Sequence, residues 1–582
     1  MRPLDWVVLV GSLASIVAYG LYRGRGSNTV DRYLLAGKTM PWYAMALSIM
    51  ATQASAITFI STTGQSYVDG MRFVQFYFGL PLAMVVLSAT AVPIFHRAKV
   101  YTAYEYLENR FDPKTRALAS FIFLMQRGLS VGLTFYAPAI VLSVIFGWPD
   151  HLTTLIIGIT VVIYTVTGGI RTVTWTDVQQ MLIILFGLVV ALIMILVLLP
   201  RQVTILDAMH LAGMAGKLNA VTLNFNWDDR YNLWSGLIGG MFLALSYFGC
   251  DQSQVQRYLT GKSIAQSKLS LLFTATAKIP MQFFILFIGA MVFVFYIFTP
   301  APLLFQHTEY ERIQRPEFHA RYDPIEARYQ DASQRRKAAA LAIVQARHQD
   351  DAPAEAEALA RYRRAQRDLD DARRQGARLV TDTGGEKHFS DTNYIFLSFV
   401  TRYLPEGIVG LVIAVILAAT MSSSSGEINS LATVTVVDLY KRHIRKDGTD
   451  HHYVTASRVA TAFWGAYAVA FSGFGKHLGS LIEAVNIVGS LFYGSLLGVF
   501  VLAFFFKRVG GTGAFLGMLA GEAAIFAAFL FTGISFLWYN VIGCVVVIAV
   551  GMTVNLVSPG TSAKSSARPD TVPATRRPHR QP

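Results

Sequence analysis

Long apolar segments recur along the whole chain, and short polar loops separate them. Windows free of Asp, Glu, Lys and Arg include residues 73–95, 128–149, 178–200, 407–426, 484–506 and 523–563. By the length of roughly twenty residues that a helix needs to cross a bilayer, the pattern predicts about thirteen membrane-spanning helices. The first is expected to begin near Leu4, the ninth near Asn393 and the last near Ser535. The predicted fold class is an all-α polytopic membrane protein.

One long segment departs from this pattern. From residue 307 to 390 the chain is charged and rich in the helix formers Ala, Arg, Glu and Gln. The sequence D-D-A-P at Asp350–Pro353 divides the segment, because proline stops one helix and opens the next. We therefore expect a helical hairpin outside the membrane. Its predicted apolar seam consists of Tyr322, Tyr329, Leu341, Leu359, Tyr362 and Leu369. A passive extension and a partner-binding arm both fit, and no particular protein partner is indicated.

The hairpin divides the chain into four predicted segments. Residues 1–306 hold the first eight spans, 307–390 the hairpin and 391–558 the last five spans. Residues 559–582 are rich in Ser, Pro, Arg and Thr, which is typical of a disordered tail. The two cysteines, Cys250 and Cys544, fall in predicted spans and indicate neither a disulfide framework nor a metal site.

Composition and charge agree with a membrane location. The chain has 582 residues, of which 53% are hydrophobic and 15% charged, whereas soluble chains carry about 25% charged residues. The net charge of +14 lies mainly in alternate short loops, the arrangement of the positive-inside rule rather than of a nucleic-acid-binding surface. That rule predicts an integral membrane protein of a bacterial inner membrane, with the N-terminus and the hairpin outside and the C-terminal tail in the cytoplasm.

Four consecutive serines interrupt one apolar span. They lie in A-A-T-M-S-S-S-S-G-E at Ala418–Glu427. Hydroxyl groups cost free energy in hydrocarbon unless they have partners, and clustered oxygens suit a small hard cation. The serines either bind such a cation or bond to their own helix, where they also let a neighbouring helix pack closely. Both interpretations fit this segment.

Two further spans are predicted to be broken. The second span contains A-T-Q-A-S-A-I-T-F-I-S-T-T-G at Ala51–Gly64, and the seventh contains S-Y-F-G-C-D at Ser246–Asp251. Each span opens one of two groups of five spans. Paired broken helices at corresponding positions indicate a transporter built from inverted repeats, with its site near the middle of the membrane. No catalytic motif or nucleotide-binding loop stands out, so we do not expect an enzyme.

Several motifs resemble the sodium/solute symporter family, and especially its monocarboxylate, iodide and multivitamin branch and the bacterial sialic-acid symporters. They are D-R-Y-L-L-A-G at Asp31–Gly37, T-A-Y-E-Y-L-E-N-R-F at Thr102–Phe111, G-G-I-R-T-V-T-W-T-D-V-Q-Q at Gly168–Gln180, Q-V-Q-R-Y-L at Gln254–Leu259, and N-S-L-A-T-V-T-V-V-D-L-Y at Asn429–Tyr440. The resemblance runs from residue 4 to 557 outside the hairpin. It implies a LeuT-like core of two inverted five-helix repeats, with one leading and two trailing helices.

The resemblance also implies ion sites. One sodium ion would be held by main-chain carbonyls and hydroxyls of Ala51, Ala54, Ala419, Ser422 and Ser423. A second ion, found in some members, would use Asp177, Ser422 and Ser425. Glycine stands at position 426, where those members have another hydroxyl, and the neighbouring Glu427 either compensates or pairs with a basic residue.

Candidate solute contacts lie on the broken helices and on the helices expected to face them. They are Gln53, Ser55, Thr58, Gln75, Gln126, Arg127 and Tyr247. Arg127 stands well inside its span, where it binds either the carboxylate of a solute or an internal acid. Ile57 and Thr58 replace the Glu and Gln of sugar-transporting relatives, which disfavours a hexose.

These observations predict a secondary active transporter. Sodium, the co-transported ion, would complete the solute site at the broken helix, and alternating access would then carry both inward across the lipid bilayer. The expected solute is a small organic molecule that bears a carboxylate. Two alternatives remain at this point: a proton-coupled symporter that uses Asp177 or Glu427, and a sensor that binds a solute without moving it.

Overall fold

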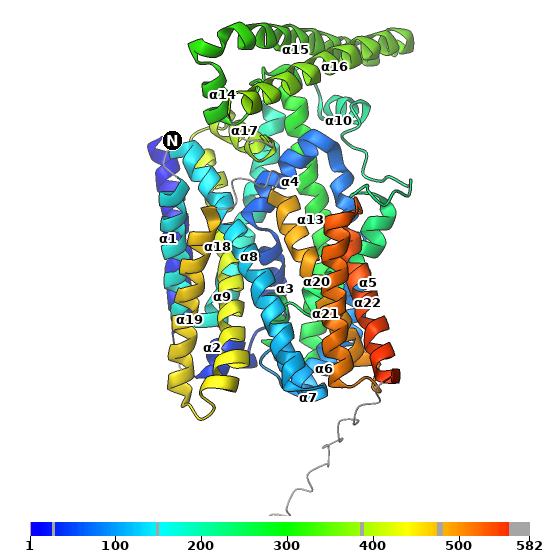
Figure 1. Ribbon diagram of the computed structural model, residues 1–582. Helices are drawn as coiled ribbons and strands as arrows, with labels where there is room; N and C mark the ends of the chain where they lie inside the picture. Colours follow the sequence, from blue (N-terminus) through cyan, green and yellow to red (C-terminus); the bar gives the residue numbers. More distant parts are fainter. Residues whose placement is uncertain (1, 26–28, 147–149, 385–388, 474–480, 558–582) are drawn as a thin grey trace, which may run out of the picture.

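The computed structural model describes residues 2–25, 29–146, 150–384, 389–473 and 481–557. The regular secondary structure of the described residues is helical, apart from an isolated bridge between Met40 and Gly261. Figure 1 shows an upright bundle with two long helices lying across one end. We call that end the hairpin face. The predicted disordered tail, residues 559–582, lies outside the described residues.

The upright helices form the bundle. They are α1 (Pro3–Gly24), α3 (Trp42–Gln53), α4 (Ala56–Asp69), α5 (Leu80–Ala89), α6 (Ala91–Ala98), α8 (Pro113–Phe146), α9 (Asp150–Val197), α11 (Gly240–Gly249), α12 (Gln252–Leu259), α13 (Ile264–Phe298), α18 (Ile408–Val434), α19 (Asp450–Phe471), α20 (Leu481–Phe505), α21 (Gly511–Phe531) and α22 (Phe536–Val557).

Shorter helices connect them. They are α2 (Val30–Leu35), η1 (Ala36–Lys38), η2 (Gly70–Tyr77), α7 (Ala103–Arg110), α10 (Ile205–Met214), the π-helical η3 (Ser235–Gly239), η5 (Thr392–Tyr394), α17 (Ile395–Tyr403) and the π-helical η6 (Thr435–Ile444). The hairpin segment consists of α14 (His307–Ile313), η4 (Pro316–Phe318), α15 (His319–His348) and α16 (Ala352–Asp382).

By length and composition, nine helical stretches of the described residues can cross a membrane. Two of them, Ala56–Ala98 and Leu152–Val197, have 43 and 46 residues, about twice the length of one crossing. The second, in α9, is kinked at Gly169, whose φ of 57° and ψ of −151° are not helical. A Cβ atom at this position would lie 2.3 Å from the carbonyl oxygen of Tyr33. The prediction of about thirteen spans stays a prediction.

Both predicted helix breaks are confirmed. The chain leaves helical geometry at Ala54 and Ser55, between α3 and α4. It does so again at Cys250 and Asp251, between α11 and α12. Asp251 caps α12, because its Oδ1 accepts a hydrogen bond of 2.8 Å from the amide of Ser253.

The predicted start of the ninth span is wrong. The segment near Asn393 forms η5 and the nine-residue α17, and the spanning helix α18 begins only at Ile408. Between them, Leu404 is extended and Gly407 has a φ of 79°. Pro405 lacks a main-chain donor and disfavours helical geometry in the residue before it.

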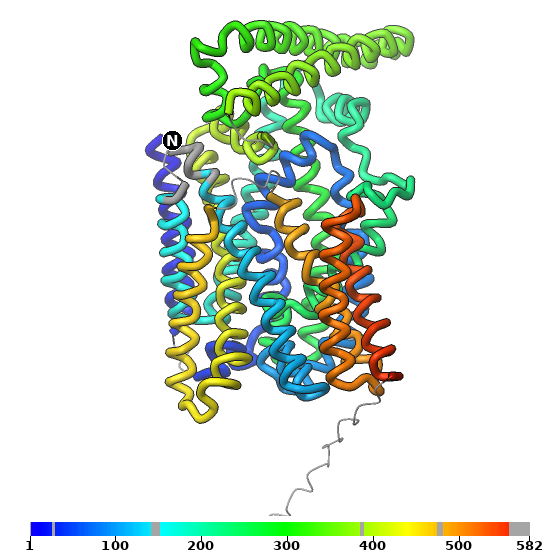
Figure 2. The backbone as a smooth tube through the Cα atoms, viewed as in Figure 1, coloured from blue at the N-terminus to red at the C-terminus, as the bar shows by residue number. Residues whose placement is uncertain are grey.

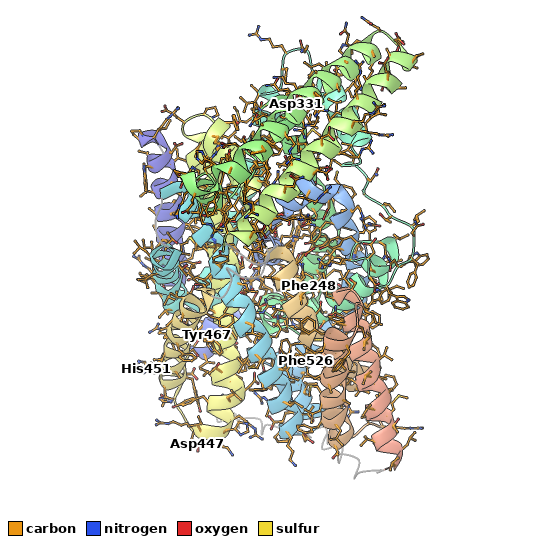
Figure 3. The ribbon with its side chains drawn as sticks, turned by 45° about the horizontal axis from the view of Figure 1, so that its top comes forward. Phe248, Asp331, Asp447, His451, Tyr467 and Phe526 are labelled. Carbon is orange, nitrogen blue, oxygen red and sulfur yellow. The ribbon has the colours of Figure 1, made fainter. Side chains whose placement is uncertain are left out.

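The surface of the bundle fits a lipid environment. Large apolar side chains are exposed along α9, α21 and α22, among them Phe186, Ile193 and Phe529. In Figure 3 the labelled charged residues Asp331 and Asp447 lie toward the two ends, whereas Phe526 lies between them. Figure 2 shows the first helix (blue) and the last helices (red) on opposite sides of the bundle. An apolar belt between two polar ends is typical of a membrane protein.

The hairpin helices α15 and α16 pack along each other and against the membrane domain. Of the predicted seam, Tyr322, Tyr329, Tyr362 and Leu369 are buried, whereas Leu341 and Leu359 are half-buried. Arg336 of α15 donates a 2.7 Å hydrogen bond to the carbonyl of Tyr296 on α13. Arg373 of α16 contacts both carboxylate oxygens of Asp391, at 2.8 and 3.0 Å. These contacts hold the hairpin over one end of the bundle.

Candidate functional site

A small cavity of about 110 Å³ lies at the first helix break. We call it the central cavity. The α3–α4 break contributes Gln53, Ser55 and Thr58, and α18 contributes Ser423 and Glu427. The rest of its wall comes from Thr52, Ile57, Phe76, Tyr77, Gln126, Arg127, Ser130, Thr134, Leu243, Tyr247, Ile482, Val485, Asn486 and Tyr493. Six of the seven predicted solute contacts therefore meet in one place.

The helix break frees main-chain carbonyls beside this cavity. The amide of Ala54 bonds the carbonyl of Met50 at 2.9 Å, and the hydroxyl of Thr58 bonds that of Gln53 at 3.0 Å. Among the described residues, no donor is found for the carbonyl oxygens of Ala51 and Ala54. Both residues are fully buried. Unpaired buried carbonyls cost free energy unless a partner such as a cation satisfies them.

The serine cluster lies on α18, which packs against α3 and α4. Ser423 lines the central cavity, and its hydroxyl donates to the carbonyl of Ala419 at 2.7 Å. The hydroxyl of Ser422 instead donates to Asp177 at 2.6 Å. A hydroxyl that donates its proton keeps lone pairs that can accept a cation. The predicted sodium ligands thus come from two packed elements, with Ser423 and the helix break on the same cavity.

The predicted second ion site already contains a cation, the guanidinium of Arg257. Its Nη2 lies 3.0 Å from Oδ2 of Asp177, and its Nε donates to the hydroxyl of Ser48 at 3.0 Å. All three residues are buried. A Cβ atom on Gly426 would lie 2.3 Å from Nη2 of Arg257. Glycine at this position therefore leaves the space that the guanidinium occupies.

Ser425, also predicted for the second site, donates to the carbonyl of Ser422 at 3.1 Å. Glu427 does not contact Asp177 in the described interactions and belongs to a different cluster. Its Oε1 accepts a 2.9 Å hydrogen bond from Nη1 of Arg127. Its Oε2 lies 3.3 Å from the hydroxyl of Thr134. The acids predicted for one ion site thus pair with two different arginines.

Arg127 lies between two acids. Besides Glu427, it forms a close ion pair through Nη2 with Asp251 at the second helix break, and Nη2 also lies 2.8 Å from the hydroxyl of Tyr493. That hydroxyl donates to Asp251 at 3.0 Å. We call Arg127, Asp251, Glu427 and Tyr493 the arginine cluster. With both carboxylates ionised, it carries a net charge of −1.

Asp251 and Tyr493 are functional candidates that the sequence analysis missed. Asp251 ends the motif that predicted the second break, and an acid inside an apolar span was the available signal. Tyr493 lies in α20 without any local motif to mark it. Only the packing of α20 against α8 and α11 brings it to Arg127.

Several polar atoms at the central cavity lack partners among the described residues. They are Gln53 Oε1, Gln126 Oε1, Arg127 Nε and Ser130 Oγ. Tyr247 completes this wall, with its ring centroid 5.6 Å from the Arg127 guanidinium and its hydroxyl accepting a 2.7 Å bond from Gln254. A solute with both acceptor and donor groups would satisfy these atoms.

Gln75 is not part of the cavity, so its prediction as a solute contact needs correction. Its side-chain amide donates to the carbonyl of Tyr231 at 2.8 Å and accepts from the amide of Thr222 at 2.8 Å. Gln75 lies in η2 and is fully buried. Its polar atoms hold the loop before η3, a role that depends on contacts 147 and 156 residues away in the sequence.

The comparison with protein families gives one match across most of the chain. The model of the sodium:solute symporter family matches residues 33–310 and 381–521. The two matched stretches leave out residues 311–380, which contain α15 and most of α16. The chain therefore resembles this family on both sides of the hairpin.

Individual proteins give the same picture. Over 535 residues, this chain is 27% identical to human sodium-coupled monocarboxylate transporter 1, with 91% of this chain and 73% of that protein covered. It is also 27% identical to the sodium/sialic acid symporter SiaT of Proteus mirabilis, with 96% of both covered. Among solved structures, a substrate-bound, outward-open sodium-coupled sialic acid symporter aligns with a TM-score of 0.73 and 24% identity, covering 96% of this chain and 98% of that one. This likeness shows the fold.

Proposed function

We propose that this chain, which belongs to the sodium:solute symporter family, carries a small carboxylate-bearing solute through its central cavity. As a member of that family it is a membrane transporter, not an enzyme, and it couples solute movement to sodium. The proposal therefore concerns the solute and the residues that bind it. The observation that carries it is the central cavity, where the helix break, Ser423 and Arg127 meet.

The size and lining of the cavity support a small solute. Its volume of about 110 Å³ is below the 300–1,000 Å³ that is common for drug-sized ligands. Nε of Arg127 can donate to a carboxylate, while the carbonyl oxygens of Gln53 and Gln126 can accept from a hydroxyl. A short hydroxycarboxylate offers both groups. The relatives include a monocarboxylate transporter, which accords with this solute class.

The charge around the cavity offers a reason for sodium coupling. An anionic solute that approaches the arginine cluster meets a net charge of −1. A sodium ion at the carbonyls of Ala51 and Ala54 and the hydroxyl of Ser423 brings this charge to zero. At a separation of roughly 6 Å and an effective dielectric constant of 20, one unit charge changes the energy of another by about 3 kcal/mol. By reciprocity, the solute strengthens sodium binding by the same factor.

For the orientation, we propose that the hairpin face lies outside the cytoplasm of a bacterium, with the protein in the inner membrane. The positions of three short helices with basic residues support this orientation. In Figure 1, α2, α6 and α7 lie at the end opposite the hairpin, and they carry Arg32, Arg97 and Arg110. Positive loops favour the cytoplasmic side. Sodium and solute would then enter from the hairpin face and leave at the basic face.

Uptake by purified protein in proteoliposomes tests the proposal. Short carboxylates such as lactate and pyruvate are expected to accumulate in sodium and not after choline replaces it. Hexoses, amino acids and sialic acid serve as comparison solutes under the same gradient. Accumulation of a hexose or sialic acid with no uptake of short carboxylates would overturn the solute class. Equal accumulation in choline, driven by a pH step, would instead favour the proton-coupled alternative.

Ser423→Ala is expected to weaken sodium activation about tenfold while leaving the recognition of solutes unchanged, because it removes one oxygen from the proposed ion site. The sodium concentration for half-maximal uptake measures this effect. Ser424→Ala is the matched control, since Ser424 is equally buried on the same helix but does not line the cavity. Equal sodium dependence of the two variants would remove Ser423 from the ligand set.

A further inference from the structure

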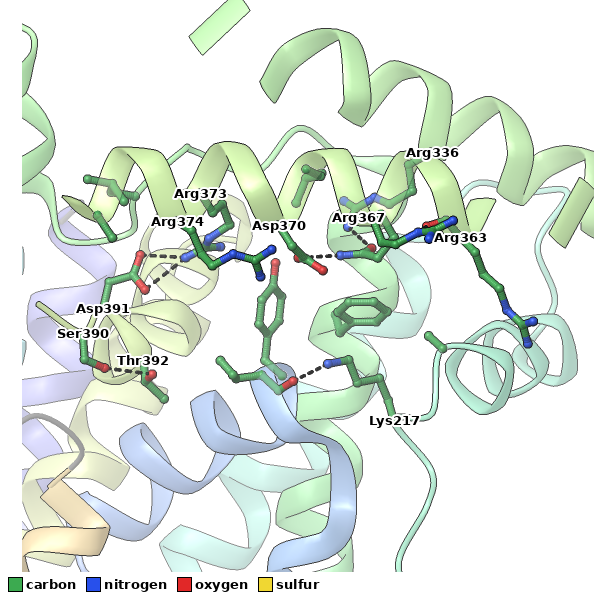
Figure 4. Close-up of a pocket in the computed structure, with 18 of the residues that line it drawn as sticks. Lys217, Arg336, Arg363, Arg367, Asp370, Arg373, Arg374, Ser390, Asp391 and Thr392 are labelled. Atoms are coloured by element: carbon green, nitrogen blue, oxygen red, sulfur yellow. Dashed lines mark hydrogen bonds and ion pairs between the residues drawn. The ribbon is translucent and has the colours of Figure 1, made fainter. Parts of the chain in front are cut away.

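A separate cavity lies under the hairpin rather than in the membrane. Its volume is about 890 Å³, and it opens between α16 and the hairpin face of the bundle. Its lining includes Tyr67 and Val68 of α4, Phe293 of α13, and Met214 and Ala215 at the end of α10. We call this space the vestibule. Figure 4 shows side chains of α16 above it and Lys217 below.

Most of the charged side chains that line the vestibule are cations. Six cationic side chains and two carboxylates face it, namely Lys217, Arg336, Arg363, Arg367, Arg373 and Arg374 with Asp370 and Asp391. Two of the cations have acidic partners, because Arg373 pairs with Asp391 at 2.8 Å and Arg374 pairs with Asp371. Among the described residues, the other four form no ion pair. An excess of positive charge therefore remains in the vestibule.

Arg336 is the most constrained of these cations. It is 1% exposed, and its Nη atoms donate to Gln366 at 3.0 Å and to the carbonyl of Tyr296 at 2.7 Å. Both partners are neutral, and its Nε has no partner among the described residues. A buried guanidinium with only neutral partners favours the approach of an anion.

Lys217 adds a second constrained cation on the opposite wall. Its ammonium group donates to the carbonyl of Val68 and lies 4.7 Å from the ring centroid of Phe293. No carboxylate lies within ion-pair distance of it among the described residues. Two cations thus face the vestibule from above and below, from α15 and from the loop after α10.

We propose that the vestibule is an anion-binding site that takes small carboxylates at the hairpin face. The pair between Arg373 and Asp391 shows how such a ligand would be held, since one guanidinium nitrogen contacts both carboxylate oxygens. The Nη atoms of Arg363 and Arg367 have no partner among the described residues and offer the same geometry to a ligand. This site is distinct from the central cavity and shares no lining residue with it.

The helix α4 lines both the vestibule and the central cavity. Thr58 near the start of α4 lines the central cavity, and Tyr67 near its end lines the vestibule. At 1.5 Å of rise per residue, the two positions are roughly 14 Å apart. Gly64, between them, lets the carbonyl of Thr392 approach so closely that a Cβ atom would lie 1.9 Å from it. An anion bound under the hairpin would therefore lie roughly 14 Å along α4 from the proposed transport site.

Local cysteine labelling tests the proposal without any transport measurement. Ala377 lines the vestibule, and a single A377C substitution gives a reporter, because the native Cys250 and Cys544 are buried. The rate with a negatively charged sulfonatoethyl methanethiosulfonate is divided by the rate with its trimethylammonium analogue. A360C, exposed on the same helix and away from the vestibule, supplies the intrinsic ratio. We expect the ratio at A377C to be about tenfold higher.

Replacing arginines by neutral glutamines in the A377C protein identifies the side chains that cause the preference for the anionic reagent. R363Q/R367Q is expected to lower the ratio at least threefold. R364Q/R378Q removes the same charge from exposed positions of α16 that do not line the vestibule, and is expected to leave the ratio unchanged. Equal ratios at A377C and A360C, or equal effects of the two double variants, would overturn the proposal. Because labelling needs no uptake, these results do not depend on the proposed function.

Protection by small anions identifies the ligand. Acetate at constant ionic strength is expected to slow the labelling of A377C several-fold and that of A360C not at all. Inorganic phosphate is the comparison anion. Protection by phosphate without protection by acetate would contradict the carboxylate assignment, and protection by neither would contradict a binding site.

The pH dependence of the ratio is a further expected result. Burial lowers the pKa of Lys217 to about 8, against the opposing effects of Asp370 on α16 and Asp69 on α4, and Arg336 on α15 lowers it further. A lowered lysine pKa means that the charge is present below pH 8 and lost above it. The labelling ratio at A377C should therefore fall between pH 7 and pH 9, and the thiol's own titration cancels in the ratio. Lys217→Gln should remove this fall.

Discussion

Arg127→Gln is expected to abolish uptake and to destabilise the protein by about 3–5 kcal/mol, because it leaves the buried carboxylates of Asp251 and Glu427 without a cation. Both acids lie at the centre of the membrane domain and are nearly fully buried. The loss is best measured as the fall in Tm of the purified protein in detergent, together with uptake in proteoliposomes.

A double substitution separates the effect of the unpaired charges on stability from the effect of the missing arginine on uptake. R127Q/E427Q removes one carboxylate together with the cation and is expected to recover part of the lost Tm, because only Asp251 is then left without a cation. It should not recover uptake, because the proposed carboxylate anchor is still missing. E427Q alone keeps the ion pair with Asp251 and serves as the control for the change at position 427. If R127Q has the Tm of the unmodified protein, the arginine cluster does not stabilise the fold. If R127Q/E427Q transports normally, Arg127 is not the anchor.

The elements of the site that could be predicted are local in sequence. The helix break at Ala54 and Ser55 was indicated by small and hydroxyl residues within one span. The serines of α18 were recognisable as a polar cluster in an apolar window. Ser423 and Glu427 are one helical turn apart, so both reach the same cavity. Such features can be predicted from one segment of the sequence, without knowing which helix packs against it.

The remaining elements depend on contacts between distant segments. Arg257 reaches Asp177 across 80 residues, and Arg127 reaches Glu427 across 300 residues. The spacing of charges along the chain does not indicate which acid each arginine meets. Gln75 was mistaken for a solute contact for the same reason, since the loop at Thr222 and Tyr231 that uses its amide is far away in sequence.

The expected number of sodium ions rests on the same long-range contact, between Arg257 and Asp177. In this structure the guanidinium of Arg257 gives the Asp177 carboxylate a positive partner without an ion from solution. We therefore expect one sodium ion per solute and a Hill coefficient near 1 for the sodium dependence of uptake. The proposed second-ion residues Asp177, Ser425 and Glu427 would then serve structure, with Glu427 at Arg127.

Gly426→Ser is expected to convert this site from an internal ion pair to an ion site. Its Cβ atom would lie 2.3 Å from Nη2 and 2.8 Å from Nη1 of Arg257, so the guanidinium must move away from Asp177. The new hydroxyl then stands beside Asp177 and Ser422, where a sodium ion can replace the displaced cation. We expect the Hill coefficient for sodium to rise from about 1 to nearly 2, with uptake reduced at low sodium about tenfold.

Gly426→Ala is the matched control, because it displaces Arg257 equally but supplies no oxygen. It is expected to lose uptake and about 3 kcal/mol of stability at every sodium concentration, since Asp177 is left buried without a cation. G213A controls for the change from glycine in a helix, because nothing lies within 4 Å of a Cβ atom there. A Hill coefficient near 2 in the unmodified protein would show that Arg257 does not take the place of an ion. Equal behaviour of G426S and G426A would show that Asp177 cannot hold sodium even when Arg257 is displaced.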